Sequence, residues 1–402
     1  PSGRTLGRAE SRSGASDPLL IQTLPADGRY RVRITESNFG GSPDHVVRLS
    51  IGELPFLTGI FPLVLPAGME STVEGMGVHL GTRRTLTVPA SEPGERTLPL
   101  DSTWRSRRDA KVRVTALLAP IEAEPNDVPA QAMTLPGPVT VNGRLQPATA
   151  GGPADVDLFR FTAQRGVTYV IETEAAQRGS PADTRLEVLH PDGRPVERVR
   201  LQAMRNSAIT FRPETSDETG IRFENWEEME LNDLLWCGGE VMKLFRAPQG
   251  PDSDSLLYTS NGRRRGFFDT TPTAHYLEEP VYYVVPLAPG EPSIPNGLPV
   301  FTVHYANEDA ALRDLGTDSR IHFTAPDDAE YLVRVSDARG FGGPDHVYAL
   351  TIRPAQPDFS VQLRGANPTV AAGSGQSFSV HVRRIDGFEG PVRVDLQHVP
   401  AG

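Results

Sequence analysis

The sequence predicts an all-β fold made of tandem β-sandwich modules, and three observations lead to this prediction. Short segments alternate apolar and polar side chains with the period of a half-buried strand, as in Tyr-Arg-Val-Arg-Ile at 30–34. The 402 residues include 38 glycines and 37 prolines, which mark frequent turns, and long runs with a helical period are few. The third observation is an internal repeat, in which residues 17–51 align with residues 318–352 without a gap. The same supersecondary unit therefore occurs twice.

The first copy of the repeat occupies the start of the chain. Both copies contain Pro-Asp-His-Val, at 43–46 and 344–347. Alternation predicts three strands in the first copy, at 19–23, 30–35 and 45–51. We expect residues 1–54 to be the C-terminal half of a sandwich whose first half lies before this sequence, so that the chain is a segment of a larger multi-domain protein.

Residues 55–118 are predicted to form a second small all-β unit. Phe61-Pro62 is followed by Pro66 and Gly68, and then by a strand that contains glycine. This pattern resembles the immunoglobulin-like modules of the IPT/TIG type, and the resemblance implies an immunoglobulin-like fold. Residues 356–402 are expected to begin another immunoglobulin-like module. Its strands are expected at 359–363, 378–382 and 392–396, which are too few to close a sandwich.

Residues 119–355 are predicted to form a complete β-sandwich that ends with the second copy of the repeat. The strands expected in its first part lie at 139–141, 158–162, 168–173, 186–189 and 208–211. An insertion at about 214–317 differs in composition, since it contains Trp226, Trp236, Cys237 and a tyrosine-rich strand at 281–285. Its aromatic residues would suit the core of an inserted β-rich subdomain, or a shallow site for a peptide or carbohydrate. The core is the simpler assignment.

Two motifs rich in acidic side chains relate this third unit to a known family. It opens with Glu122-x-Glu124-Pro-Asn126-Asp127, and Asp155-x-Asp157-x-Phe-x-Phe follows about 28 residues later. In this order, with Gly143 between them, the motifs resemble the bacterial pre-peptidase C-terminal domain, a relative of the collagen-binding domains of clostridial collagenases. The resemblance implies a jelly-roll-like sandwich with a non-catalytic accessory or adhesive role outside the cell.

Six side chains of these motifs are candidate calcium ligands: Glu122, Glu124, Asn126, Asp127, Asp155 and Asp157. Calcium takes six to eight oxygen ligands, and a spacing of two residues puts alternate side chains on one face of an extended segment. In the collagen-binding relatives, acidic and amide residues of the opening segment hold calcium together with aspartates before the Phe-x-Phe strand. The alternative is a turn flanked by solvated linker charges. The acidic cluster at 307–309 is expected to be a loop.

The sequence predicts no catalytic residues. The repeated Pro-Asp-His pairs a carboxylate with an imidazole, but its presence in both copies favours a turn before the last strand. Cysteine catalysis would need Cys237 with a base such as His275 or His304, and no signature of such a site is present. Serine-hydrolase, zinc-protease and phosphate-binding motifs are also absent from the sequence. A hydrolase centred on the insertion is kept as an alternative.

Charge and hydropathy narrow the class of partner. The net charge of −11 disfavours nucleic acid as a partner. The sequence contains no run of 18 apolar residues, so no membrane span is predicted. We expect a non-catalytic binding or surface-display array from a large exported bacterial protein, located outside the cell or at its surface. Its expected partners are an extracellular protein or polysaccharide and the neighbouring domains of the same chain. The main alternative is an accessory region of a secreted peptidase that aids substrate binding or maturation.

Overall fold

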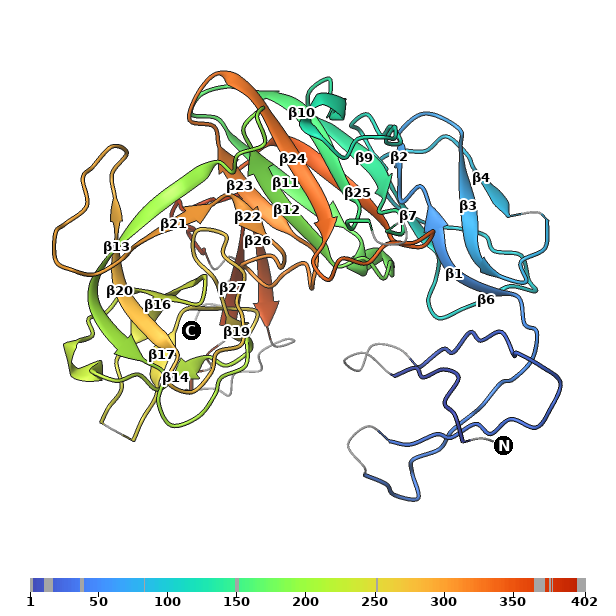
Figure 1. Cartoon of the computed structure of the whole chain (residues 1–402), viewed down its shortest axis with the longest axis horizontal. Coiled ribbons are helices and arrows are strands. Elements are labelled where there is room, and N and C mark those ends of the chain that lie inside the picture. The colour runs from blue at the N-terminus through green and yellow to red at the C-terminus, as the bar shows by residue number, and fades with distance from the viewer. Residues whose placement is uncertain are drawn as a thin grey trace.

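The computed structural model describes residues 3–10, 17–36, 40–82, 84–148, 152–250, 252–364, 373–375, 377 and 379–395 (Figure 1). Strands make up 41% of the chain and helices 2%, so the predicted all-β fold of several sheets is confirmed. The described helical residues form single turns, η1 (Pro129–Gln131), η2 (Ala176–Arg178) and η3 (Trp226–Glu228). Among the residues that the structure describes, no helix is long and apolar enough to cross a membrane.

A β-sandwich of two sheets lies at the centre of the molecule (Figure 1), and all of its strand pairs are antiparallel except β10 with β8. One sheet has the order β22-β12-β24-β10-β8, and the other has the order β23-β11-β25-β9. The strands are β8 (Met133–Thr134), β9 (Val139–Arg144), β10 (Val156–Ala163), β11 (Thr168–Glu174), β12 (Thr184–Leu189), β22 (Ala306–Asn307), β23 (Arg320–Thr324), β24 (Ala329–Asp337) and β25 (Val347–Pro354). The strands expected between 139 and 189 are confirmed, and the second copy of the repeat supplies β23, β24 and β25.

Alternation along the strands builds the core between these sheets. On β10, Phe159 and Phe161 point inward, and on β25, Leu350 and Ile352 do the same. Aromatic rings join the two sheets, as where Phe161 lies edge-on to Phe323, with ring centroids 6.1 Å apart. Residues of period two thus face a common core, as the sequence pattern predicts.

The unit at 55–118 packs on the outer face of the sandwich. Its strands form two sheets, β4-β3-β1-β6 and β2-β7-β5. They are β1 (Phe56–Phe61), β2 (Val64–Pro66), β3 (Ser71–Val78), β4 (Thr85–Val88), β5 (Gly94–Thr97), β6 (Arg105–Ser106) and β7 (Lys111–Thr115). Val347 and Ala349 of β25 belong to the core of this unit, whereas Tyr348 between them faces the sandwich core. Strand β25 is therefore buried on both faces.

An additional seven-stranded sheet, ordered β14-β17-β16-β15-β20-β13-β21, extends beside the sandwich (Figure 1). Its strands are β13 (Glu197–Ala208), β14 (Gly220–Ile221), β15 (Leu234–Cys237), β16 (Glu240–Arg246), β17 (Ser255–Leu257), β20 (Pro280–Leu287) and β21 (Val300–His304), and β18 (Thr259–Ser260) pairs separately with β19 (Arg263–Arg264). The sheet begins at Glu197, before the boundary expected near 214, because β13 pairs with β20 and β21 of the insertion. The strand expected at 208–211 is wrong, since β13 covers 197–208 and Ile209 forms only an isolated bridge to Phe223.

Aromatic residues of the insertion contribute to cores on both faces of this sheet. Phe223 and Tyr283 are buried on one face. On the other face Trp236 stacks on Phe301, with ring centroids 3.8 Å apart and an interplanar angle of 8°. Tyr276 is the main exception, since 76% of it is exposed.

Residues 17–54 differ from the prediction of three strands. The described parts, 17–36 and 40–54, contain no strand, and Val32, Val46 and Ile51 are exposed. A strand needs hydrogen-bonding partners, and in the second copy these are β9, β10, β11 and β12. The described residues of the first copy form no such pairing. Alternation alone does not make a strand.

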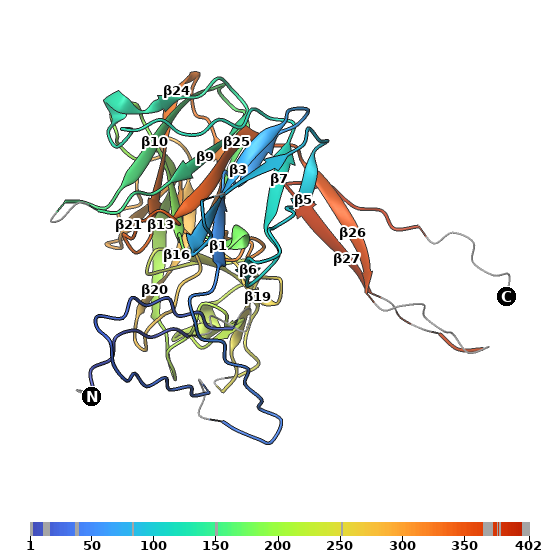
Figure 2. The ribbon, with the colours of Figure 1, turned by 90° about the vertical axis from the view of Figure 1, so that its right-hand side faces the viewer.

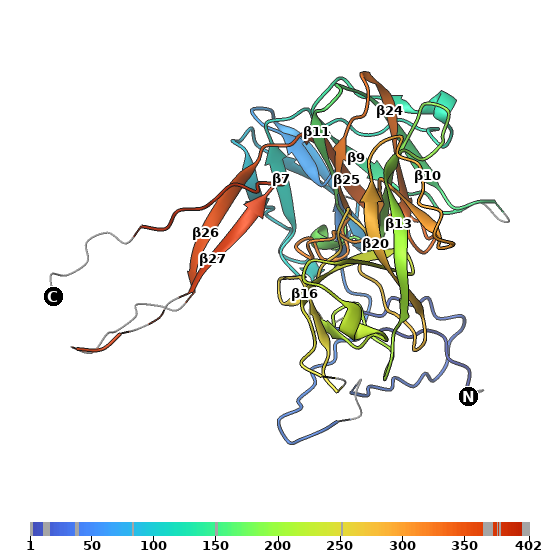
Figure 3. The same cartoon turned by 90° about the vertical axis from the view of Figure 1, so that its left-hand side faces the viewer.

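The C-terminal residues form a hairpin of β26 (Asp358–Arg364) and β27 (Ser379–Ile385). Figures 2 and 3 show that this hairpin projects away from the sandwich. The strand expected at 359–363 is confirmed, and the one expected at 378–382 is confirmed from residue 379 onward. Residues 392–395 are not in a strand, and Leu396 lies outside the described residues.

Candidate metal centre

The opening segment of the sandwich lies along β9. Thr140 N donates to Leu118 O at 2.9 Å, Asn142 N donates to Pro120 O at 2.9 Å, and Glu122 N donates to Asn142 O at 2.9 Å. Through these bonds the opening segment pairs in parallel with β9 over a short stretch. They bring the Glu122 side chain to the end of the sandwich core.

The second motif reaches the same place from β10. Asp157 is the first residue of the inward row that continues with Phe159 and Phe161, so its carboxylate is buried. Leu158 N donates to Asn126 O at 3.1 Å and ties the two motifs together. Carboxylate oxygens of Glu122, Glu124 and Asp157 lie within 4.8 Å of one another.

Two of these side chains hold polar atoms that have no protein partner. Asn126 and Asp157 are each 0% exposed. Both side-chain atoms of the Asn126 amide, and Oδ1 of Asp157, form no hydrogen bond. An unsatisfied buried polar group costs about 1–3 kcal/mol. The residues therefore fit a cation with oxygen ligands, which would satisfy the carboxylate and amide oxygens together.

The pKa values of the clustered carboxylates also fit a site for a cation. Burial and the nearby Glu124 carboxylate raise the pKa of Glu122 to about 7. Burial, with Asp127 and Glu124 nearby, raises the pKa of Asp155 to about 6. Burial and the Glu122 carboxylate raise the pKa of Asp157 well above its ordinary value. None of these carboxylates forms an ion pair with a described residue. No positively charged side chain therefore offsets the repulsion among them.

Tyr348 lies between two of the carboxylates. Its hydroxyl is 3.0 Å from Glu122 Oε2 and 2.5 Å from Asp157 Oδ2. A hydroxyl donates only one proton, so it can donate to Glu122 Oε2 or to Asp157 Oδ2 but not to both. The other oxygen of Glu122, Oε1, accepts from Arg144 N at 2.5 Å. The remaining contact needs a shared proton or a cation.

Gly143 on β9 makes room for this arrangement. A Cβ atom at this position would overlap the Tyr348 ring and hydroxyl and would lie 2.6 Å from Glu122 Oε2. The sequence motif contains Gly143, but the steric reason for it becomes visible only in the fold. Tyr348 was not anticipated from the sequence, although it directly follows the repeated Pro-Asp-His-Val, where the first copy has Val47.

The outer side of the cluster is formed by Asp127, which is exposed, and by Asp155, which is half-buried. One oxygen of Asp155 accepts a hydrogen bond from Gln146 N, and Glu124 Oε2 accepts one from Asn126 N at 3.0 Å. The structure thus groups the ligand atoms of Glu122, Glu124 and Asp157, and Asp155 lies close to Asp127 and Glu124. Asn126 is joined to β10 through its backbone carbonyl.

No known protein family, curated protein or solved structure matched the chain. The function is therefore inferred from the residues of the chain itself.

The catalytic alternative placed Cys237 with His275, and the structure does bring these residues together with Glu279. Cys237 is fully buried, and burial followed by the nearby Glu279 carboxylate raises the pKa of its thiol. A thiol in this state is a poor nucleophile. His304 lies on the edge strand β21, opposite Glu197.

The remaining predicted clusters have structural contacts. In the 307–309 segment, the Asn307 amide donates to Asp309 O at 2.6 Å and accepts from Arg320 N at 3.0 Å. In the repeated motif, His346 N closes a turn onto Gly343 O at 3.1 Å, directly before β25. The His346 ring contacts the Asp345 carboxylate at 3.2 Å. The loop expected at 307–309 begins one residue later, because Asn307 ends strand β22 and pairs with Leu186, and only residues 308–309 form a bend.

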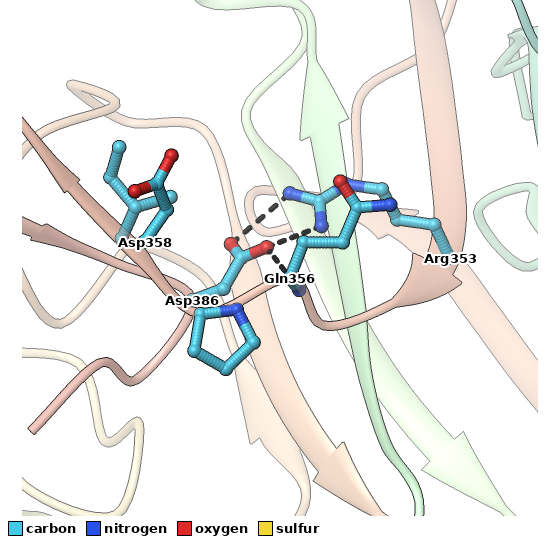
Figure 4. Close-up of a pocket in the computed structure, with 6 residues that line it drawn as sticks. Arg353, Gln356, Asp358 and Asp386 are labelled. Carbon is cyan, nitrogen blue, oxygen red and sulfur yellow. Dashed lines mark hydrogen bonds and ion pairs between the residues drawn. The ribbon is translucent and has the colours of Figure 1, made fainter.

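A surface hollow lies where the C-terminal hairpin meets the sandwich (Figure 4). Both Asp386 carboxylate oxygens accept from the Arg353 guanidinium, and Gln356 N donates to one of them at 2.9 Å. The charges in this hollow are thus paired within the protein, and they fasten the hairpin to the end of β25.

Proposed function

We propose that this chain is a non-catalytic binding segment of an exported bacterial protein, and that its sandwich is stabilised by calcium. The observation that supports this most is that carboxylate oxygens of Glu122, Glu124 and Asp157 lie within 4.8 Å of one another, while Asp157 Oδ1 and Asn126 Oδ1 are buried without a hydrogen bond. The clustered carboxylates have raised pKa values and form no ion pair within the described residues. A protein rarely retains such a cluster without a counter-charge.

The residues that would hold calcium are Glu122, Glu124, Asn126, Asp127, Asp155 and Asp157. Calcium would neutralise their mutual repulsion and supply the partner that Asn126 Oδ1 and Asp157 Oδ1 lack. The Glu122 segment also leads from the 55–118 unit into the sandwich, so the ion would stiffen this connection.

The likeness of these motifs to the pre-peptidase C-terminal domain supports an extracellular location and an adhesive or accessory role. Extracellular calcium modules bind with dissociation constants of about 10⁻⁴–10⁻³ M, which suits an oxygen cluster that is partly open to solvent. The ligand class would be an extracellular protein or polysaccharide. An accessory region of a secreted peptidase is the second candidate, because the same motifs favour it equally. Distinguishing the two requires a binding assay on collagen-like and polysaccharide matrices.

Thermal unfolding with calcium and with chelator tests the proposal. At a calcium concentration about 100 times the dissociation constant, binding to the native state alone adds about 2.7 kcal/mol. For a domain of 150–250 residues this raises Tm by about 5–10 °C. Asp157→Asn should abolish the calcium-dependent rise, and in chelator it should be at least as stable as the wild type, because it removes a buried charge.

Asp192→Asn is the matched control, because Asp192 is an exposed turn aspartate bonded to Arg194. This variant should keep the full calcium response. If the wild type shows no shift at about 100 mM calcium, about 100 times a dissociation constant of about 10⁻³ M, or if Asp157→Asn keeps the shift, the cluster does not bind calcium.

A further inference from the structure

A second cluster of side chains, unlike the first, lies in the inserted sheet. Cys237 ends β15, and Glu279 directly precedes β20, which is the neighbour of β15 in the sheet. One ligand atom each from Cys237, His275 and Glu279 lies within 4.8 Å of the others. The sulfur and the imidazole distinguish this group from the all-oxygen cluster at 122–157.

The backbone fixes all three side chains. His275 N and O pair with Glu214 O and N at 2.8 and 2.9 Å. Tyr276 N donates to Glu279 Oε2 at 2.9 Å. Gly238 follows Cys237 in the hairpin turn with a φ of +53°, and a Cβ there would overlap Glu279 Oε1. The turn therefore leaves room for the Glu279 carboxylate next to the cysteine.

The second ring nitrogen of His275, Nε2, also has a carboxylate partner. His275 Nε2 lies 3.0 Å from Glu240 Oε2. Burial opposes ionisation of Glu240, but hydrogen bonds from His275 and Arg264 hold its pKa below the ordinary value. Glu240 is therefore an ionised acceptor, and Nε2 carries the proton that it donates.

This network orients the histidine rigidly. Arg264, which is 0% exposed, donates to Glu240 at 2.8 and 3.1 Å and also donates to the carbonyl of Thr273 at 2.7 Å. With Nε2–H engaged, Nδ1 faces Glu279 Oε2 at 3.3 Å. A carboxylate on the non-ligating nitrogen is the usual support of a metal-bound histidine.

We propose that Cys237, His275 and Glu279 bind a divalent transition metal of the zinc class. Thiolate sulfur, imidazole nitrogen and carboxylate oxygen together favour zinc over calcium or magnesium. In a tetrahedral zinc site with bonds of about 2.0–2.1 Å, nitrogen and oxygen ligands are about 3.3 Å apart. The Nδ1–Oε2 separation already has this value.

Metal binding must displace the proton of the Cys237 thiol. The Cys237 Sγ–H bond breaks as the sulfur–metal bond forms, and the proton leaves to solvent, so binding strengthens as pH rises. Three protein ligands leave a fourth position, and the Glu279 side chain, 19% exposed, provides access from solvent. Cys237 and His275 are otherwise closed off.

Cobalt titration of the metal-free wild-type chain tests this assignment. About one equivalent of Co²⁺ should give a thiolate-to-cobalt charge-transfer band in the near ultraviolet, and Zn²⁺ should displace it. Cys237→Ser should remove the band and lower zinc affinity at least about tenfold. Asp157→Asn, in the other cluster, should keep the band. A folded wild type without a band at millimolar Co²⁺ would overturn the proposal.

Thiol labelling gives a readout that needs no variant. Cys237 is the only cysteine of the chain, so modification reports on it alone. In mild denaturant, Zn²⁺ should slow the alkylation of Cys237 at least about tenfold, whereas Ca²⁺ should not. Equal rates with and without Zn²⁺ would mean that His275 is simply held between two carboxylates, and the metal assignment would be wrong.

Discussion

At the scale of single residues, Asp157 shows how an ordinary strand pattern can place a charge in a core. It occupies the same face of β10 as Phe159 and Phe161, so the geometry that buries the two rings also buries the carboxylate. Its Oδ1 has no hydrogen bond, and neither has the Asn126 amide. These two residues are the strongest reason to assign a cation to the cluster.

The raised pKa values predict how the metal-free protein responds to pH. Glu122 ionises near 4.5 in the unfolded chain and near 7 in the fold, so between these values the fold binds more protons than the unfolded chain. Stability therefore falls as pH rises, by an amount on the order of 3 kcal/mol for Glu122. Asp155 and Asp157 act in the same direction.

Chemical denaturation in chelator from pH 5 to pH 8 measures this effect. The free energy of unfolding should decrease over this range, Glu122→Gln should reduce the decrease, and saturating calcium should remove it. A metal-free protein that becomes more stable from pH 5 to pH 8, with no change in Glu122→Gln, would show that these carboxylates do not repel one another.

At the scale of elements, the cluster lies where the opening segment at 122–127 meets the ends of β9, β10 and β25. Gly143 on β9 predicts a sensitive position, since any Cβ would overlap the Tyr348 ring and contact Glu122. Gly143→Ala should destabilise the chain by about 1–3 kcal/mol, the usual effect of overpacking, and should weaken calcium binding as well. Equilibrium unfolding and calcium titration measure the two effects.

Gly137→Ala is a suitable comparison for Gly143→Ala. A Cβ at Gly137 meets no atom within 4 Å, although its φ of +131° adds backbone strain. That variant should lose stability without losing calcium affinity. If Gly143→Ala binds calcium as tightly as the wild type, Gly143 is not needed to shape the site.

The strands also show how much of the fold can be predicted from the sequence. Alternation predicted β9, β10, β11 and β12 well, because each of these strands has one face on a core and finds partners within the chain. The same pattern failed at 17–36 and 40–51, which pair with no strand of the described residues. It also missed most of β13, whose partners β20 and β21 are distant in sequence. The six ligand candidates could be named because they lie in two short motifs, whereas Tyr348 came from a strand almost 200 residues away from Asp157.

At the scale of the whole molecule, the 55–118 unit and the sandwich share a continuous interface. Asn142 is fully buried there, and its side chain accepts from Leu63 N at 3.0 Å and Val64 N at 2.9 Å while donating to Val64 O. Its backbone carbonyl accepts from Glu122 N. The interface and the metal cluster are therefore neighbours in the structure.

This interface predicts that the two units unfold together. Asn142→Ala leaves two N–H groups and one carbonyl without partners, so we expect a loss of at least about 3 kcal/mol and a separation of the unfolding transition into two steps. Glu95→Ala removes an exposed ion pair with Arg178 across the same interface and should cost no more than about 1 kcal/mol. Calorimetry on both variants measures this, and an unchanged Asn142→Ala would mean that the units fold independently.

The most direct test of the calcium assignment is a calorimetric titration of the metal-free wild-type chain with Ca²⁺ at neutral pH, with Asp157→Asn beside it. We predict one site per chain in the wild type, with a dissociation constant at or below the millimolar range typical of extracellular modules, and no binding in Asp157→Asn. A wild type that takes up no calcium, or a variant that binds it equally well, would contradict the account.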